Sequence, residues 1–330
     1  MKAATLCPEP VVLTPGRVAD YLALTKPRVA VLVLFTVAAG ALLAAGREVQ
    51  PLALLHVVLG TALVAAGASA LNQWVERSSD ARMRRTENRP LPAGRLQPLE
   101  VLLFGTLLGL GGVTYLALLS RPWAAAVAAG TFACYVGVYT PLKRKTTLNT
   151  LVGAVPGALP PVIGWCAVRG DISLEALTLF LVVFVWQVPH FLAIAWIYRD
   201  EYARAGLRML PVIDRDGWLT GWNMVAYCLA LIPASLSPVL LGSAGWVYLV
   251  GAVLLGLGFL ASALSFWRAR GPRRTALRSR PDGSGEPSCG GFVRTRAQAR
   301  RVLRASLVYL PGLLALLLMD RALFWLLVAG

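Results

Sequence analysis

The sequence predicts an all-α, polytopic membrane protein in which nine transmembrane helices form one bundle and the N-terminus is cytoplasmic. Composition is the first indication, because 57% of the 330 residues are hydrophobic and only 15% are charged. Patterning is the second, because the apolar residues form runs near the thickness of a bilayer rather than amphipathic stripes. The third is the placement of basic residues, which fall almost entirely on alternate loops between these runs.

Nine apolar runs are long enough to cross a bilayer. In chain order they lie at 29–45, 52–73, 99–119, 122–140, 148–168, 174–196, 221–241, 245–267 and 305–328. The ninth run is interrupted by two charges, Asp320 and Arg321. The fifth is rich in residues that kink a helix and let a neighbour or ligand approach closely, namely Gly153, Pro156, Gly157, Pro160, Pro161 and Gly164.

The net charge of +16 does not indicate nucleic-acid binding, because its distribution follows membrane topology. All but four of the 32 Lys and Arg residues fall on the side of the membrane that holds the N-terminal tail, the exceptions being Arg47, Arg121, Arg169 and Arg321. The positive-inside rule therefore places the N-terminus in the cytoplasm and the C-terminus outside. The five cysteines are scattered without a CxxC pair, which gives no indication of a disulfide framework or a zinc site.

The chain is expected to divide into a cytoplasmic N-terminal tail, residues 1–28, and one intramembrane domain, residues 29–330. The tail lacks the apolar core of a signal peptide, so the first span is expected to act as an uncleaved insertion signal. Within the domain, residues 268–304 combine Gly, Ser and Pro with repelling positive charges, which predicts a basic, flexible cytoplasmic loop. We expect this loop to have no catalytic role, although its charge suits anionic lipid headgroups.

The most informative polar residues follow the second apolar run. Asn72, Glu76 and Asp80 recur every four residues, so they share one face if the helix continues past Leu71. Two carboxylates at a membrane boundary, with arginines directly after them, suit a divalent metal that holds a polyphosphate. Mg²⁺ takes oxygen ligands, often one or two carboxylates plus the phosphates, and arginine supplies a planar fork for further phosphate oxygens. The alternative is an ordinary charged cytoplasmic loop after a helix with polar residues at common spacing.

A weaker echo of this motif follows the sixth run, which ends in Tyr198, Asp200 and Glu201. Two acidic helix ends at the same membrane level can converge on one cavity if the bundle contains two related halves. Inside the sixth run, His190 follows Gln187 and Pro189. This histidine is interpreted either as a hydrogen-bonded interior residue or as a polar contact to substrate or metal.

A third basic segment, Lys143-Arg144-Lys145, follows the fourth run and suits the second side of a diphosphate. An ordinary positive-inside loop explains these cations equally well. The sequence contains no P-loop, GxSxG or HExxH motif. The chemistry that these features favour is metal-assisted departure of a diphosphate at an apolar cavity, where a carbocation is sheltered from water until the acceptor attacks.

These residues resemble the intramembrane prenyltransferase superfamily that includes 4-hydroxybenzoate polyprenyltransferase. Its pattern N-x-x-x-[DE]-x-x-x-D-x-x-M-x-R-T-x-x-R-P is matched position by position by Asn72, Glu76, Asp80, Met83, Arg85, Thr86, Arg89 and Pro90. Within the superfamily, residues 20–265 most resemble the protohaem IX farnesyltransferase (haem O synthase) branch, through the stretches 139–144, 186–191 and 200–212. Where many relatives carry a second D-x-x-x-D motif, this chain has His190, Tyr198, Asp200 and Glu201 instead.

The resemblance implies nine helices around a central cavity that opens toward the cytoplasm. It implies that protohaem IX (haem B), farnesyl diphosphate and water give haem O and diphosphate with Mg²⁺ as cofactor, in the inner membrane of a bacterial-type cell. By the same resemblance, Glu76 and Asp80, with Asn72, would hold Mg²⁺, and Asp200 would hold a second ion. The leaving group would be neutralised by Arg85, Arg89, Lys143 and Arg144, and His190 would be a haem-side contact.

Two other interpretations stay open. The first is a member of the same superfamily that acts on a different aromatic acceptor, such as a quinone precursor or a tetrapyrrole acid. The second is a membrane transporter, which would place ionisable residues deep in several spans. The lipid bilayer is a partner in each case, nucleic acid is not, and hand-over of the product to haem A synthase or a terminal oxidase is expected only if haem is the acceptor.

Overall fold

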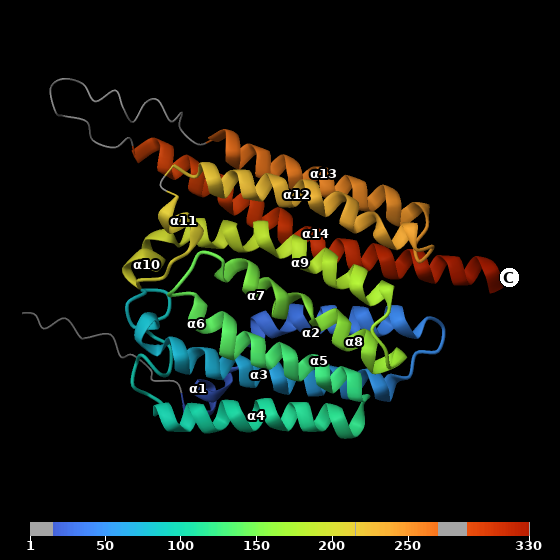
Figure 1. The fold of residues 1–330 in the computed structure, drawn as a ribbon, viewed down its shortest axis with the longest axis horizontal. Coiled ribbons are helices and arrows are strands. Elements are labelled where there is room, and N and C mark those ends of the chain that lie inside the picture. The colour runs from blue at the N-terminus through green and yellow to red at the C-terminus, as the bar shows by residue number, and fades with distance from the viewer. Residues whose placement is uncertain (1–15, 215, 270–288, 330) are drawn as a thin grey trace, which may run out of the picture.

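The computed structural model describes residues 16–214, 216–269 and 289–329, apart from the side chains of 289–294 and 324–329. All elements of this described part are helical (Figure 1). They are α1 (Arg17–Leu24), α2 (Pro27–Ala45), α3 (Pro51–Asp80), α4 (Pro98–Leu119), α5 (Pro122–Ala133), the π-helical turn η1 (Cys134–Tyr139), α6 (Thr140–Leu142), α7 (Asn149–Ala158), α8 (Pro160–Arg169), α9 (Leu174–Ile197), α10 (Arg199–Arg204), α11 (Leu210–Ile213), α12 (Trp218–Leu240), α13 (Trp246–Ala269) and α14 (Cys289–Ala329).

The predicted fold class is confirmed, because the described chain contains nine helical segments long and apolar enough to cross a membrane. The fourth combines α5, η1 and α6, and the fifth combines α7 and α8. The break in the fifth falls at Leu159, directly before Pro160 and Pro161. Proline has no N–H to donate, so Pro160 and Pro161 leave carbonyls of the preceding turn without their helical partner, and the helix is interrupted there although Leu159 keeps a helical backbone.

Proline also marks where several spans begin. Pro27, Pro51, Pro98 and Pro122 each occupy the first turn of a helix, where the missing N–H costs nothing and the fixed φ suits the helix. At α4 this signal is reinforced by a capping box between Gln97 and Glu100, in which the Gln97 backbone N–H donates to Glu100 Oε2 at 3.0 Å.

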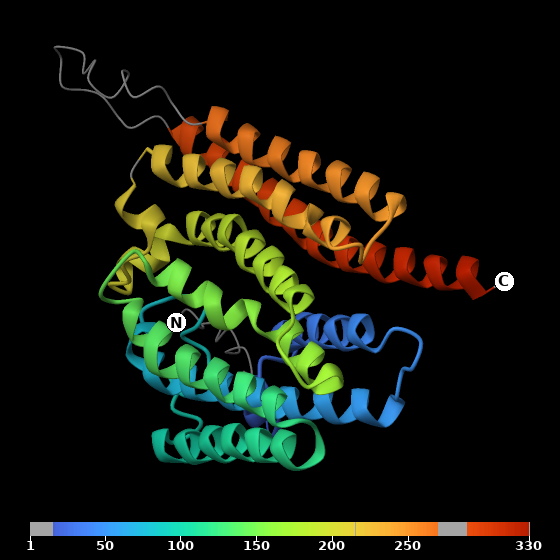
Figure 2. The same cartoon turned by 45° about the vertical axis from the view of Figure 1, so that its right-hand side comes forward.

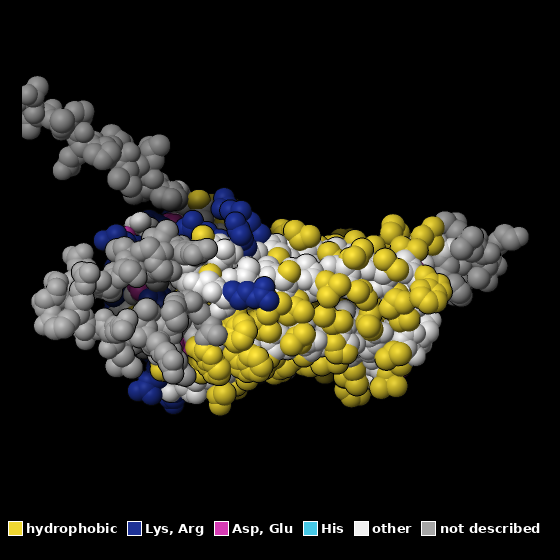
Figure 3. Space-filling view, turned by 90° about the horizontal axis from the view of Figure 1, so that it is seen from above, with side chains coloured by type: hydrophobic (Ala, Val, Ile, Leu, Met, Phe, Trp, Pro, Cys, Tyr) yellow, Lys and Arg dark blue, Asp and Glu magenta, His cyan; other side chains and the backbone are white. Residues whose placement is uncertain are grey.

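The central helix of the bundle is α9, with α12 and α14 packed on one side and α7 and α8 on the other (Figures 1 and 2). Helix α2 lies against α8, where a side chain at Gly40 would collide with the Pro161 carbonyl and one at Gly164 with the Val37 carbonyl. Absent side chains at these two positions let the helices approach closely. Figure 3 shows hydrophobic side chains over the flank of the molecule, as expected of a lipid-facing surface, and Lys and Arg toward one end.

The two ends of the bundle differ. The end that bears α10, α11 and the loops 81–97 and 143–148 is called the charged end below. The end that bears the loops 46–50, 120–121 and 170–173 is called the opposite end.

Two boundaries differ from the prediction. Of the predicted loop 268–304, residues 289–304 belong to α14, while 270–288 lie outside the described residues. The helix forms there because Ala299 and Val302 are fully buried, and because Arg296 donates through Nε and a terminal nitrogen to the Ile197 carbonyl at the end of α9. Of the predicted tail, residues 17–24 form α1 with Leu24 buried, and 1–15 lie outside the described residues.

The charge that interrupts the ninth apolar run has a structural role at the opposite end. Asp320 is 7% exposed, and its carboxylate accepts hydrogen bonds from the Gly245 and Tyr248 backbone N–H groups where α13 begins. These are donors that the first turn of a helix leaves unpaired. A carboxylate there also complements the positive end of the helix dipole.

Replacement of Asp320 by alanine should therefore destabilise the α13–α14 pair. We expect a loss of about 1–2 kcal/mol, because a capping acceptor is removed and two donors are left buried. The measurement is thermal unfolding of the purified protein in detergent, with Asp171→Ala as the matched control, because Asp171 is exposed at the same end. Equal unfolding temperatures for the two variants would contradict the capping role.

Candidate active site

The three polar residues after the second apolar run do share one face. Helix α3 continues through Asp80, and Asn72, Glu76 and Asp80 are all buried, at 2%, 9% and 1% exposure. Their side chains lie at the charged end, where α3 leaves the apolar part of the bundle. A carboxylate is expensive to bury unless a partner compensates its charge, so the partners define what this cluster can do.

Each carboxylate is paired with a cation from a different segment. Lys143 Nζ lies 2.7 Å from Glu76 Oε1, and Arg89 donates to Asp80 Oδ2 at 2.6 Å. Lys143 follows α6, whereas Arg89 comes from the loop after α3. Thr86 fixes that loop by donating its hydroxyl to the Asp80 carbonyl at 2.8 Å.

Asn72 connects the cluster to two further segments. Its amide oxygen accepts a hydrogen bond from Lys26 Nζ at 3.2 Å, and its amide nitrogen donates to Thr140 Oγ1 at 3.2 Å. Lys26 directly precedes α2 and has a positive φ of 48°. Sequence analysis did not select Lys26 as a site residue. The signal that it offered was a lysine placed between Thr25 and Pro27 at the start of the first span.

Charge and burial act on the two lysines in different ways. Burial, reinforced by the positive charge of Arg89, lowers the pKa of Lys26 to about 7. Burial also opposes the charged form of Lys143, but the neighbouring Tyr139 and Glu76 outweigh it and raise the pKa of Lys143 above its ordinary value. Lys143 therefore stays cationic at neutral pH, and its ammonium lies 4.5 Å from the centre of the Tyr139 ring.

The remaining predicted cations lie at the rim of the cluster. Arg144 donates to Ser78 Oγ at 2.8 Å and to Ser79 Oγ at 2.9 Å, on the same end of α3. Arg85 lies over the Tyr198 ring at 4.6 Å and donates to Tyr202 Oη at 3.3 Å. Both arginines are exposed, so their forks face the solvent side of the cluster.

The two acidic motifs identified in the sequence contact each other in the structure. Arginine and apolar residues make these contacts, rather than carboxylates that act on one common ligand. The Arg85 backbone N–H donates to Glu201 Oε2 at 3.2 Å. Met83 packs with Met209 in a small buried cluster. The Arg208 backbone N–H donates to the Lys143 carbonyl at 3.0 Å, which joins the second motif to the Lys143 loop.

Asp200 is not brought to the other two carboxylates. Its side chain is 61% exposed and lies 3.6 Å from Arg199. Among the described residues, no group of three or more His, Cys, Asp and Glu side chains is placed to hold a metal. The structure thus places Glu76 and Asp80 together and Asp200 apart from them.

His190 lies outside the charged cluster, between α9 and α14. Its Nδ1 is 2.7 Å from Ser306 Oγ, and its ring stacks on Trp186 with centroids 5.0 Å apart. Trp186 Nε1 donates to the Ser306 carbonyl at 2.9 Å. This arrangement matches the interior, hydrogen-bonded interpretation of the histidine, and contact with haem stays a prediction.

An apolar cavity of about 160 Å³ lies beside Lys26. Lys26 lines this cavity and also donates to Asn72, so this lysine joins the cavity to the charged cluster. The walls come from α2, α3, α5 and the break between α7 and α8, and include Val33, Val64, Ala65, Phe132, Pro160 and Ile163. Small and branched apolar side chains around a narrow space suit a hydrocarbon chain.

The carboxylates also fit a divalent cation. Asp80 Oδ1 is buried and has no hydrogen-bond partner in the described part of the protein. A buried carboxylate oxygen without a donor is costly unless a ligand completes it. Together with Glu76 on the same helix face, it offers the two-carboxylate oxygen set that Mg²⁺ accepts when phosphate oxygens and water supply the rest.

The fold is that of a multi-pass membrane protein with a buried cluster of paired charges at one end, and comparisons with known proteins give its family. The sequence profile described as the UbiA prenyltransferase family matches residues 33–279, so the chain belongs to the UbiA prenyltransferase family. A protein named protoheme IX farnesyltransferase from Solibacter usitatus (strain Ellin6076) is 44% identical over 311 residues, which cover 92% of this chain and 98% of that protein. Another of that name, from Salinibacter ruber, is 43% identical over 91% of this chain and 98% of its own length.

Solved structures confirm the fold. A structure of digeranylgeranylglyceryl phosphate synthase superposes with a TM-score of 0.72 at 15% identity, covering 92% of this chain and 98% of that one. A UbiA homolog from Archaeoglobus fulgidus bound to GPP and Mg²⁺ gives a TM-score of 0.57 at 14% identity, covering 88% and 99%. The family match and the relatives named protoheme IX farnesyltransferase confirm the superfamily and the branch that the sequence motifs indicated.

Proposed function

We propose that the protein transfers a farnesyl group from farnesyl diphosphate to a vinyl group of protohaem IX (haem B), with addition of water, to give haem O and diphosphate. The observation that carries this proposal is the buried carboxylate and cation cluster, which Lys26 joins to an apolar cavity. The acceptor is supported by the relatives named protoheme IX farnesyltransferase, which match this chain over nearly its whole length.

The diphosphate would be bound by the cations of the charged end. Lys143 and Arg89 already lie within contact distance of the two carboxylates, and Arg85 and Arg144 extend the basic surface outward. The planar fork of arginine suits phosphate oxygens, and a lysine ammonium adds a compact charge. Lys26, which lines the cavity, would lie where the diphosphate joins the prenyl chain.

Glu76 and Asp80, with Asn72 beside them, would hold Mg²⁺, and a fold relative bound to GPP and Mg²⁺ supports this choice of ion. The bound cation would supply charge that stabilises the departing diphosphate. A second ion at Asp200 stays a prediction, because that carboxylate lies apart from the other two.

The atoms and electrons of this reaction balance without a covalent enzyme intermediate. The carbon–oxygen bond of farnesyl diphosphate breaks, and the diphosphate leaves with the bonding electrons toward Lys143, Arg89 and their neighbours. The apolar cavity would hold the farnesyl chain and exclude water from the resulting cation. A carbon–carbon bond then forms to the haem vinyl group, and water adds to the new cation with loss of a proton.

The proposal includes the setting of the reaction. The nine apolar spans among the described residues make the protein a multi-pass membrane protein. We propose the inner membrane of a bacterial-type cell as its location, with the charged end in the cytoplasm. Haem O would pass from this enzyme to haem A synthase or a terminal oxidase. His190 is the proposed haem-side contact, reached from the α9–α14 interface.

Filling the cavity should impair use of the long prenyl chain. Ala65 lines the cavity from α3, so Ala65→Phe places a ring in the space that we assign to farnesyl. We expect kcat/KM for farnesyl diphosphate to fall at least about tenfold, with a smaller loss for geranyl diphosphate. Leu55→Phe on the same helix is the control, because Leu55 is 51% exposed and lines no part of this cavity. Unchanged kcat/KM in Ala65→Phe would show that this cavity is not part of the prenyl-binding site.

A further inference from the structure

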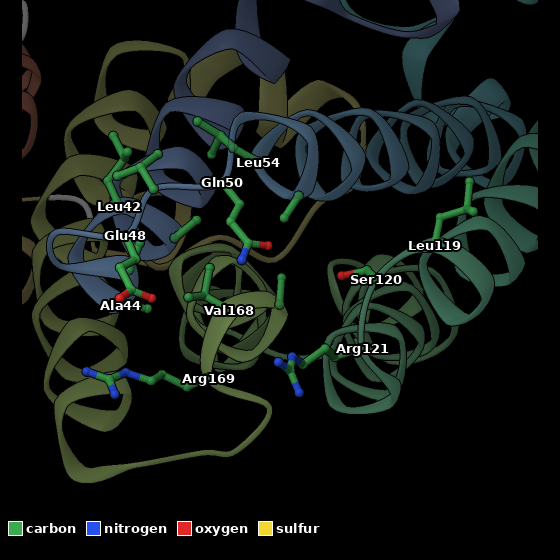
Figure 4. Close-up of a pocket in the computed structure, with 15 residues that line it drawn as sticks. Leu42, Ala44, Glu48, Gln50, Leu54, Leu119, Ser120, Arg121, Val168 and Arg169 are labelled. Atoms are coloured by element: carbon green, nitrogen blue, oxygen red, sulfur yellow. The ribbon is translucent and has the colours of Figure 1, made fainter.

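A second cavity, of about 590 Å³, lies at the opposite end of the bundle (Figure 4). The end of α2, the start of α3, the α4–α5 connection and the end of α8 surround it. Its floor is apolar, and its polar lining consists of Glu48, Gln50, Ser120, Arg121 and Arg169. The proposed reaction uses none of these residues, which lie on the far side of the membrane domain from the carboxylate cluster.

Unpaired hydrogen-bond donors gather around this cavity. The side chains of Gln50, Ser120 and Arg121 have no hydrogen bond or ion pair with any described part of the chain, and Arg169 makes no hydrogen bond there but interacts electrostatically with Glu175. In Figure 4, the Arg121 guanidinium and the Gln50 amide extend toward the middle of the space, and Arg169 lies on the far side of Val168. Gln50, Arg121 and Arg169 are exposed, so these donors are open to a ligand rich in acceptors that enters the cavity.

The distribution of charge makes these arginines unusual. Only four of the 32 Lys and Arg residues lie on this side of the predicted topology, and two of them, Arg121 and Arg169, line the one cavity. With Glu48 as the acidic group in the lining, the residues that surround the cavity carry an excess of positive charge. The cavity therefore complements an anion.

The surroundings identify the source of that anion as the bilayer. Leu119 and Val49 line the cavity and are 49% and 41% exposed, and Leu118 and Trp123, which flank the lining residues 119–121 in sequence, are 76% and 53% exposed. Exposed leucines mark the lipid-facing surface, and tryptophan is enriched at the headgroup level. Leu42, Leu54 and Val168 also line the cavity, and a lipid would cover these side chains as well as the donors, whereas a free phosphate would contact only the donors.

We propose that this cavity is a binding site for an anionic glycerophospholipid, with the phosphodiester held by Arg121, Gln50 and Ser120, and Arg169 as the second basic group. The acyl chains would leave over the exposed leucines onto the lipid-facing surface. The bound headgroup would tie together the α2–α3, α4–α5 and α8–α9 loops, which meet only at this end.

The test measures lipid retention, so its outcome is independent of the proposed prenyl transfer. Full-length protein in detergent is mixed with 1-palmitoyl-2-oleoyl-phosphatidylglycerol, and bound lipid is counted by native mass spectrometry alongside the thermal unfolding temperature. The variant is Arg121→Gln/Arg169→Gln. The control is Arg268→Gln/Arg300→Gln, which removes the same charge from exposed positions at the charged end.

We expect wild type and control to retain one phosphatidylglycerol and to unfold at a higher temperature with it than without it. Loss of a charge-assisted hydrogen bond should weaken retention about tenfold or more in the Arg121→Gln/Arg169→Gln variant. Dioleoylglycerol, which lacks the phosphate, should have no effect on wild type. Equal retention in variant and wild type would overturn the proposal. Equal stabilisation by free glycerol phosphate would also overturn it, in favour of a site for soluble anions.

Discussion

Replacement of Asp80 by asparagine should lower turnover at least about 100-fold while the protein remains inserted and folded. Asparagine keeps the size of the side chain and one oxygen, so the packing at the end of α3 is retained. It removes the negative charge that faces Arg89. An amide is also a weaker metal ligand than the wild-type carboxylate, whose Oδ1 has no hydrogen-bond partner among the described residues. A divalent cation would be held less tightly, and the diphosphate with it.

The assay compares farnesyl transfer per mole of protein at equal membrane abundance. Glu87→Gln is the matched control, because Glu87 is an exposed carboxylate on the same loop. A further arm raises the Mg²⁺ concentration, which should restore part of the Asp80→Asn activity if metal affinity is what was lost. Normal turnover in Asp80→Asn would contradict the assignment of this carboxylate as a metal ligand.

Replacement of Lys143 by methionine should have an effect of similar size on turnover, at least about 100-fold, together with a loss of stability. Methionine keeps the length of the side chain and removes the charge that lies 2.7 Å from Glu76. An ion pair that is broken on one side leaves the other charge buried and uncompensated, which costs roughly 3 kcal/mol in buried sites. The departing diphosphate would also lose a permanent cation, since the pKa of Lys143 is raised.

A double variant separates these two effects. Adding Glu76→Gln to Lys143→Met removes the uncompensated charge, so thermal stability should recover while turnover stays low. Lys145→Met serves as the control, because Lys145 is exposed and lies in the same short basic segment. Full activity in Lys143→Met would contradict a role for this lysine in diphosphate binding, and so would an equal loss in Lys145→Met. Either result would mean that the basic residues 143–145 only follow the positive-inside rule.

The features that the sequence predicted well are those set by local pattern. Apolar runs of bilayer length located the nine spans that the described part of the chain contains, and four-residue spacing placed Asn72, Glu76 and Asp80 on one buried face. Both depend on the helical period and on the cost of polar groups in lipid, which a single sequence displays directly. The run of glycines and prolines in the fifth span likewise predicted a kink, and the structure has a break in that span between α7 and α8.

The features that it missed depend on contacts between distant segments. Lys26 joins the site because it meets Asn72 across the bundle from a left-handed backbone conformation, and neither fact is visible in local sequence. Asp320 looked like an interruption of a span, yet it caps α13. The extra turns of α14 are held by burial of Ala299 and by the bond from Arg296 to α9.

The second motif depends on a side-chain direction that sequence spacing does not give. Asp200, the expected ligand of a second metal ion, is exposed beside Arg199 and apart from Glu76 and Asp80, and its role as a ligand stays a prediction. The residues of this motif that do reach the first are Glu201 and Tyr202, through Arg85. A carboxylate near a helix end can point to solvent or to the cavity, and sequence spacing alone does not distinguish these directions.

The most direct test of the proposed reaction is mass analysis of the pigment formed when purified protein is incubated with haem B, farnesyl diphosphate and Mg²⁺. The account predicts a new haem that is heavier by one hydroxyfarnesyl unit, formed with release of diphosphate and lost when EDTA removes the metal. Unmodified haem B, from protein that binds both haem and farnesyl diphosphate, would contradict the account and assign the prenyl group to a different acceptor.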